Sequence, residues 1–184
     1  MVKIICEGVG DVKNIKKVLD FFNIEYIDDM FIYTNGKSFL VNSKSEVYDT
    51  LKKQLEIGQV DKILIIADVD DSKNDEKLCG EKNTISKIEK LQEELNIQGK
   101  SDYFLACDPQ TRKGYFESLL LSTVDEEVKK CYEEFRICSG LNSKATDKNI
   151  MSELHNLTKP DKPYDFNHQN FDELKEKLIK LFEN

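Results

Sequence analysis

The sequence contains a short apolar run that ends abruptly in three carboxylates, Asp68, Asp70 and Asp71. Residues 63–67 are apolar without interruption and rich in β-branched side chains. A run of this length and character is typical of a strand that is buried on both faces, as in a parallel sheet. Residues 103–107 are predicted to form a further strand, which is also followed by an aspartate.

The first residues combine a strand, a tight turn and a helix. Residues 3–6 are predicted to form a strand, and apolar side chains on one face predict an amphipathic helix after it. This succession is the start of an α/β unit. Gly8 and Gly10 permit the turn and allow the backbone to approach a ligand. Asp11 suits the N-cap of the helix, and a catalytic role is the less favoured alternative.

The segment that follows predicts short extended pieces. Residues 24–27 and 31–34 are of strand type, and the Asn35-Gly36 pair predicts a hairpin turn into residues 38–41. Residues 36–38 resemble the end of a phosphate-binding Walker A loop, but the required upstream glycine is missing, which excludes this ATP site. The dinucleotide fingerprint is excluded because Lys13 stands where its third glycine is needed.

Helical periodicity continues through the remainder of the chain. Helices are predicted over residues 44–57, 84–96, 126–135, 145–157 and 171–182. The polar stretch 72–83 is expected to be a mobile loop over the acidic end of the sheet. Residues 1–124 are therefore interpreted as the α/β core, and residues 125–184 as a helical C-terminal extension packed on the same domain.

Composition indicates a globular protein of the cytoplasm. The chain has 184 residues, of which 39% are hydrophobic and 34% charged, and no apolar segment approaches the roughly 20 residues that span a bilayer. The N-terminus lacks the pattern of a signal peptide. Five cysteines without C-x-x-C spacing argue against a disulfide framework and a zinc site. His155 and His168 are isolated and receive no role.

Net charge limits how the protein meets phosphate groups. The formal charge is −8 and the pI about 5.0, so no broad attraction to a nucleic-acid backbone is available. Phosphates must then be met by a bound cation or by a local group of basic residues. Arg112 and Lys113, ahead of a predicted helix, are the best local candidates, although a solvated surface position explains them equally well.

Asp68 and Asp70 are the strongest candidates for chemistry. Alternation along an extended backbone places both side chains on the same side, and two neighbouring carboxylates shift their pKa values or bind a cation. Mg²⁺ is the usual partner of a few carboxylates plus substrate phosphates. Aspartate is also a common turn former, so a turn without metal is the alternative. Glu117 is equally compatible with the exposed edge of a helix.

Taken together, these residues resemble the Toprim superfamily. Its first motif, a strand followed by Glu and Gly and then by Asp in the next helix, is matched by Glu7, Gly8 and Asp11. Its Asp-x-Asp motif is matched by Asp68 and Asp70. Over nearly its whole length the chain resembles small stand-alone Toprim-like proteins of uncharacterised function, related to the Toprim domain of OLD-family nucleases.

The resemblance implies a Toprim-like α/β fold, with a mostly parallel central sheet flanked by helices on both faces. It implies Mg²⁺ (or Mn²⁺) held by Asp68 and Asp70, with Asp71 and Glu117 as further candidate ligands. Glu7 would be the general acid/base, and Gly8, Gly10, Arg112 and Lys113 would contact phosphate. The DNA-gripping and ATP-hydrolysing domains that usually accompany Toprim enzymes are missing, and an active-site tyrosine is not evident.

Three functional hypotheses follow. The first is Mg²⁺-dependent phosphotransfer on nucleic acid or nucleotide, most plausibly by a Toprim-type nuclease. The second is a non-catalytic module that keeps the metal site to bind a nucleotide or a partner protein. The third is a purely structural role without metal affinity. No membrane partner is expected, and the choice between a homo-oligomer and another protein partner stays open.

Overall fold

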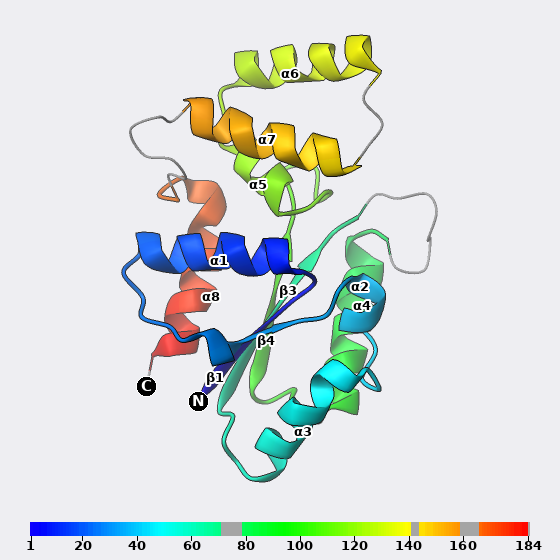
Figure 1. The fold of residues 1–184 in the computed structure, drawn as a ribbon, viewed down its shortest axis with the longest axis vertical. Helices are drawn as coiled ribbons and strands as arrows, with labels where there is room; N and C mark the ends of the chain where they lie inside the picture. Colours follow the sequence, from blue (N-terminus) through cyan, green and yellow to red (C-terminus); the bar gives the residue numbers. More distant parts are fainter. Residues whose placement is uncertain (71–78, 141–143, 159–165, 184) are drawn as a thin grey trace.

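The computed structural model describes residues 1–70, 79–140, 144–158 and 166–183. Within these ranges, four parallel strands form one sheet in the order β2-β1-β3-β4 (Figure 1). The strands are β1 (Val2–Cys6), β2 (Phe31–Tyr33), β3 (Lys62–Asp68) and β4 (Ser101–Ala106). β3 is the longest and is paired on both sides, as its continuous apolar sequence predicts.

Helices cover both faces of the sheet. One face is covered by α1 (Val9–Phe21), α5 (Phe116–Ser122) and α8 (Asp172–Phe182). The other is covered by α2 (Lys37–Leu40), α3 (Asp49–Glu56) and α4 (Glu81–Glu94). The sheet supplies both cores by alternation: Leu64 and Ile66 face the first layer, and Ile63 and Ile65 the second. The predicted α/β fold with a mostly parallel sheet between two helical layers is confirmed.

The last part of the described chain is helical. It consists of α6 (Glu126–Ser139), α7 (Lys144–Thr158), a short 3₁₀ turn η3 (Gln169–Phe171) and α8. Figure 1 shows α6 and α7 beyond the carboxyl ends of the strands, whereas α8 lies along the sheet. Leu174 and Leu178 of α8 are fully buried in the core that α1 and α5 also line.

The hairpin predicted after Asn35-Gly36 is wrong. Both residues have positive φ, 56° and 123°, as such a turn requires. The chain then enters the short helix α2 instead of a returning strand, and β2 pairs in parallel with β1. The physical reason is burial: Leu40 enters the core beside the sheet, and Lys37 reaches the end of β3. Two further 3₁₀ turns are η1 (Asp28–Met30) and η2 (Glu46–Tyr48).

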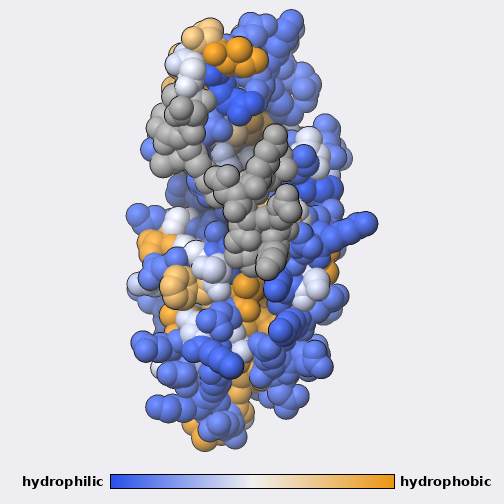
Figure 2. All heavy atoms as spheres, turned by 90° about the vertical axis from the view of Figure 1, so that its right-hand side faces the viewer, coloured by the Kyte–Doolittle hydropathy of each residue, from blue (hydrophilic) through white to orange (hydrophobic). Residues whose placement is uncertain are grey.

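The predicted loop 72–83 falls largely outside the described residues. α4 begins at Glu81, so the final part of that stretch is helical and the helix starts earlier than predicted. Figure 2 shows the side of the molecule that carries α2, α3 and α4; it is largely hydrophilic, with hydrophobic residues in small separate groups. No helix in the described ranges combines the length and the apolar character needed to cross a bilayer.

Candidate functional site

The carboxyl edge of the sheet gathers acidic residues from two separate parts of the chain. Parallel pairing aligns Cys6 with Ile66, so Glu7 and Asp68 emerge at the same edge. Asp70 follows one residue beyond a bridge between Val69 and Gly114. The structure thus brings together Glu7, Asp68 and Asp70, three of the residues that the sequence nominated.

Asp68 is the most deeply placed of these acids. It is the last residue of β3 and only 3% exposed. Its Oδ2 lies 3.3 Å from Lys148 Nζ, whereas Oδ1 is buried and has no hydrogen-bond partner among the described residues. The buried Lys37 ammonium donates to the main-chain carbonyl of Asp68 at 2.7 Å. An acceptor oxygen is therefore left unsatisfied where a cation or a donor would stabilise it.

The electrostatic surroundings of Asp68 include three other acids. Burial raises the pKa of Asp68 well above its ordinary value, Lys148 opposes this, and the charges of Asp11, Glu7 and Asp70 raise it further. Like charges around a buried carboxyl group disfavour its ionised form. A buried carboxylate whose neighbours disfavour its ionised form is typical of a site that receives a cation.

The turn between β1 and α1 holds Glu7 in place. Gly36 N–H donates to the Glu7 carbonyl at 2.8 Å, so the turn after β2 fixes the Glu7 backbone. Gly8 is the N-cap of α1, and its N–H donates to Asp11 Oδ2 at 2.9 Å. Asp11 therefore caps the helix from its third position, not from the N-cap position predicted from the sequence. Gly10 is exposed in the first turn of α1, and its backbone leaves open space around it.

Glu117 reaches the carboxyl edge through a lysine. Its Oε2 lies 3.3 Å from Lys148 Nζ, at the same distance as Asp68 Oδ2, so one ammonium group bridges two carboxylates. Lys148 Nζ also lies 4.3 Å from the centre of the Tyr115 ring. Burial lowers the pKa of Lys148, but the two carboxylates outweigh burial and raise it, so Lys148 is a permanent cation here.

Tyrosine contacts hold α7, which carries Lys148, against its neighbours. Asp147 accepts hydrogen bonds from the hydroxyl groups of Tyr115 and Tyr132. Burial raises the pKa of Tyr115 to about 12, so its hydroxyl remains a donor at neutral pH. The residue next to Lys148 is thereby fixed to the start of α5 and to α6, which positions the ammonium group.

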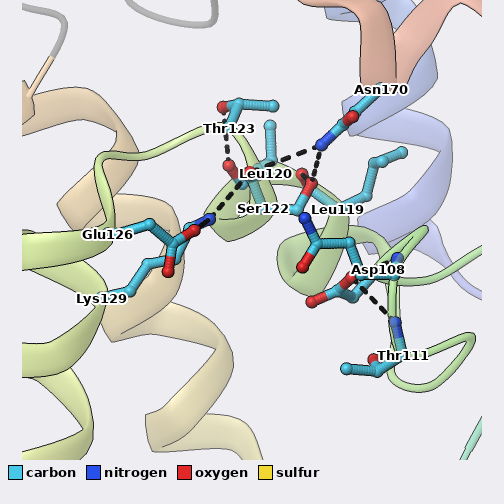
Figure 3. Close-up of polar contacts among 10 residues, drawn as sticks. Asp108, Thr111, Leu119, Leu120, Ser122, Thr123, Glu126, Lys129 and Asn170 are labelled. Carbon is cyan, nitrogen blue, oxygen red and sulfur yellow. Dashed lines mark hydrogen bonds and ion pairs between the residues drawn. The ribbon is translucent and has the colours of Figure 1, made fainter.

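Arg112 and Lys113 lie beside this edge in a tight turn. Arg112 has φ of 54° and pairs with Glu81 at the start of α4, with nitrogen–oxygen distances of 3.0 and 2.6 Å. Asp108 supports the turn by accepting from the N–H groups of Gln110 and Thr111, the latter drawn in Figure 3. α5 begins only at Phe116, so Arg112 does not stand directly at its N-terminus.

Gly114 joins the turn to the end of β3. It exchanges two main-chain hydrogen bonds with Val69, of 2.9 and 2.7 Å. Its φ is 101°, and a Cβ at this position would lie 2.2 Å from Ser118 Oγ. Only glycine fits, because the conformation and the contact each exclude a side chain.

A second polar region, at the end of α5, is occupied by the protein's own contacts. Figure 3 shows Asn170 directed at Ser122, to whose Oγ it donates at 2.9 Å, and Lys129 between Glu126 and the Ser122 carbonyl. Thr123 donates to the Leu120 carbonyl at 2.8 Å. These bonds satisfy the carbonyl groups at a helix end, so the region has a structural explanation.

The carboxylate oxygens at the carboxyl edge are ligands of the type that Mg²⁺ prefers. Within the described part of the chain, no group of three or more His, Cys, Asp or Glu side chains could hold a metal ion by itself. Mg²⁺ does not require such a cage, because it keeps several waters and binds one or two carboxylates plus substrate phosphates. Asp68 Oδ1 offers the unsatisfied buried oxygen. Asp71 lies outside the described residues.

Comparison with known proteins finds no match. This holds for protein-family models, for curated proteins and for solved structures. The resemblance to the Toprim superfamily therefore stays a prediction from the sequence.

Two lysines of this edge were missed from the sequence. Lys37 belonged to a motif excluded as an ATP site, and Lys148 lies eighty residues from its partner Asp68.

Proposed function

We propose that this protein is a Mg²⁺-dependent phosphotransfer enzyme that acts on nucleic acid or nucleotide, as a nuclease of Toprim type. The observation that carries the proposal is the buried Asp68 side chain, with one oxygen unsatisfied, among the charges of Glu7, Asp11 and Asp70. In open α/β sheets, ligands bind outside the carboxyl ends of the strands, which is where these acids lie.

The residues divide into three roles. Asp68 and Asp70 would hold the metal ion, which neutralises charge on the phosphate oxygens and activates water when it is bound. Glu7, beside them at the end of β1, exchanges a proton with the attacking or leaving oxygen. Lys148 and Lys37 balance the negative charge that carboxylates and phosphate bring to one place.

Phosphate contact would come from the turn after β1. The N-terminal end of α1 carries main-chain N–H groups and a partial positive charge, and Gly8 and Gly10 bring no side chains there. Arg112 is a weaker candidate because its guanidinium already pairs with Glu81. Glu117 supports the site through Lys148 in this structure, which leaves direct metal binding to the other acids.

The test is a cleavage assay with Mg²⁺ or Mn²⁺ on single-stranded and double-stranded DNA and RNA, and on free nucleotides. Glu7→Gln is expected to lower activity more than about 100-fold, the range seen when catalytic proton transfer is lost. Asp102→Asn is the matched control and is expected to keep wild-type activity. Asp102 lies at the amino end of β4, whereas the candidate site lies at the carboxyl ends of the strands. Activity that is equal in wild type and Glu7→Gln would remove Glu7 from the mechanism.

A non-catalytic binding module is the second candidate. The favouring observation is Lys148, which already supplies a cation between Asp68 and Glu117. This function predicts that nucleotides raise the melting temperature without being consumed. Calorimetric titration with Mg²⁺ separates both candidates from a purely structural role, for which no metal affinity is expected.

A further inference from the structure

A cavity of about 290 Å³ lies at the amino edge of the sheet, opposite the acids. It is bounded by the start of β3, the segment before β4 and the last turns of α8. Four lysines from these three segments line it: Lys62, Lys100, Lys177 and Lys180. Such a gathering is unexpected in a chain whose formal charge is −8.

The two carboxylates in the cavity wall are already paired. Asp102 accepts from Lys177 Nζ at 2.9 and 3.0 Å. Asp61 pairs with the amino group of Met1. Lys62 and Lys100 also attract Asp61, and Lys180 attracts Asp102, but none of these three lysines forms an ion pair with either carboxylate in the described part of the chain.

Those three lysines have no carboxylate partner among the described residues. Lys62 Nζ donates to the carbonyls of Lys180 and Glu183, at 2.9 and 2.6 Å. These carbonyls belong to the C-terminal end of α8, so Lys62 offsets the partial negative charge of that helix end. Lys100 makes only a long contact of 3.4 Å, with the Val60 carbonyl. The ammonium groups of Lys100 and Lys180 are exposed and remain able to bind an anion.

One wall of the cavity is apolar. It is formed by Ile63, Leu64 and Leu181, which are buried residues of β3 and α8. A volume near 300 Å³ with an apolar wall and a few charged groups is typical of a small-molecule site. The arrangement suits a ligand with a compact apolar body and an anionic end.

We propose that this cavity binds a small organic phosphate, with the phosphate on Lys100 and Lys180 and the apolar body against Ile63 and Leu181. Phosphate is preferred over carboxylate because it carries nearly two negative charges at neutral pH and meets several ammonium groups together. The site is independent of the proposed catalytic edge, which lies at the other ends of the strands.

Phenyl phosphate is the probe, titrated by calorimetry into the full chain in the presence of EDTA, so that no metal-bound phosphate contributes. The double variant Lys100→Ala/Lys180→Ala is expected to bind it at least 10-fold more weakly than wild type. Lys53→Ala/Lys130→Ala, on exposed surfaces of α3 and α6, removes the same charge and is expected to bind as wild type does. Circular dichroism checks that the variants are folded.

Three further probes define the occupant. Inorganic phosphate is expected to bind at least 5-fold more weakly than phenyl phosphate, because it gains nothing from the apolar wall. Asp68→Asn is expected to leave phenyl phosphate binding unchanged. The third probe is a short single-stranded oligonucleotide. If it binds more tightly than phenyl phosphate, and if the Lys100→Ala/Lys180→Ala variant loses this binding, the ligand of the cavity is a nucleic acid and the proposal of a small molecule is wrong. The proposal is overturned if the two double variants bind phenyl phosphate with equal affinity. It is also overturned if the wild-type protein does not bind phenyl phosphate at millimolar concentration.

Discussion

The two edges of the sheet differ in both charge and burial. At the carboxyl edge, Asp68 and Lys37 are buried and each charged group has neighbours in fixed places. At the amino edge, Lys100 and Lys180 are exposed at the ends of flexible stems. A buried charge needs a partner because desolvation is costly, whereas an exposed lysine remains solvated whatever its position. The carboxyl edge should therefore tolerate substitution far less than the amino edge.

Two glycines give the sharpest test of this difference. Gly114→Ala is expected to lower the free energy of unfolding by about 4 kcal/mol, because the new Cβ meets Ser118 and strains a positive φ. Gly99→Ala, at the amino edge, has nothing within 4 Å of its Cβ and is expected to change stability by less than about 1 kcal/mol. Urea denaturation of both variants measures this. Similar losses would mean that the edges do not differ in tolerance.

Lys148 gives the next largest effect. Lys148→Met leaves the buried Asp68 and the partly buried Glu117 as neighbouring acids and is expected to cost about 3 kcal/mol of stability. Without this lysine the pKa of Asp68 rises further, because the only opposing charge among its principal influences is removed. Mg²⁺ is expected to restore part of the loss, measured as a larger rise in melting temperature than in wild type.

The control for Lys148 is an exposed pair. Lys52→Met removes the partner of Asp49 on the surface of α3 and is expected to cost less than about 0.5 kcal/mol. If Lys148→Met lowers the free energy of unfolding by as little as Lys52→Met does, the bridge that Lys148 forms between Asp68 and Glu117 is not an important stabilising contact.

The smallest effect is expected at Lys177. Burial raises the pKa of Asp102, but hydrogen bonds from Lys177 and from Tyr103 N–H outweigh it and lower the pKa below 3.8. The stabilisation is therefore present above the unfolded-state pKa and is lost as the pH falls through the folded-state value. Lys177→Met is expected to cost less than about 1 kcal/mol at pH 7, because the Asp102 side chain is partly exposed and solvent screens the pair. Denaturation at pH 7 and near pH 2.5 checks that the difference disappears in acid.

The fold was predictable wherever burial alone determines structure. The apolar runs that became β1, β3 and β4, and the stripes of α1, α4 and α8, were identified because the core selects them. The Asn35-Gly36 pair led to the wrong prediction of a hairpin. Positive φ values are compatible with a hairpin turn and also with a turn that leads into a helix. Only the burial of Leu40 and Lys37 distinguishes the two outcomes.

The sequence identified the acidic residues of the candidate site but did not identify the basic residues that pair with them. Glu7 and Asp68 follow strands, and parallel pairing places strand ends at one edge. Lys148 has no local pattern that sets it apart from the many surface lysines, because its role depends on where α7 packs. Arg112 stood out as a local basic residue, but its pairing with Glu81 depends on contact between distant segments.

The position of α8 bears on how the chain emerges from the ribosome. Residues 1–124 contain the four strands of the described sheet and the acids at their carboxyl ends, yet α8, which helps to cover one face of the sheet, is made well after them. Until it arrives, Leu64 and Ile66 lack part of their cover, and the acids lack the counter-charge of Lys148. A nascent chain in which α8 has not yet docked exposes this apolar surface, so the sheet is fully covered only after segments far apart in the sequence have met.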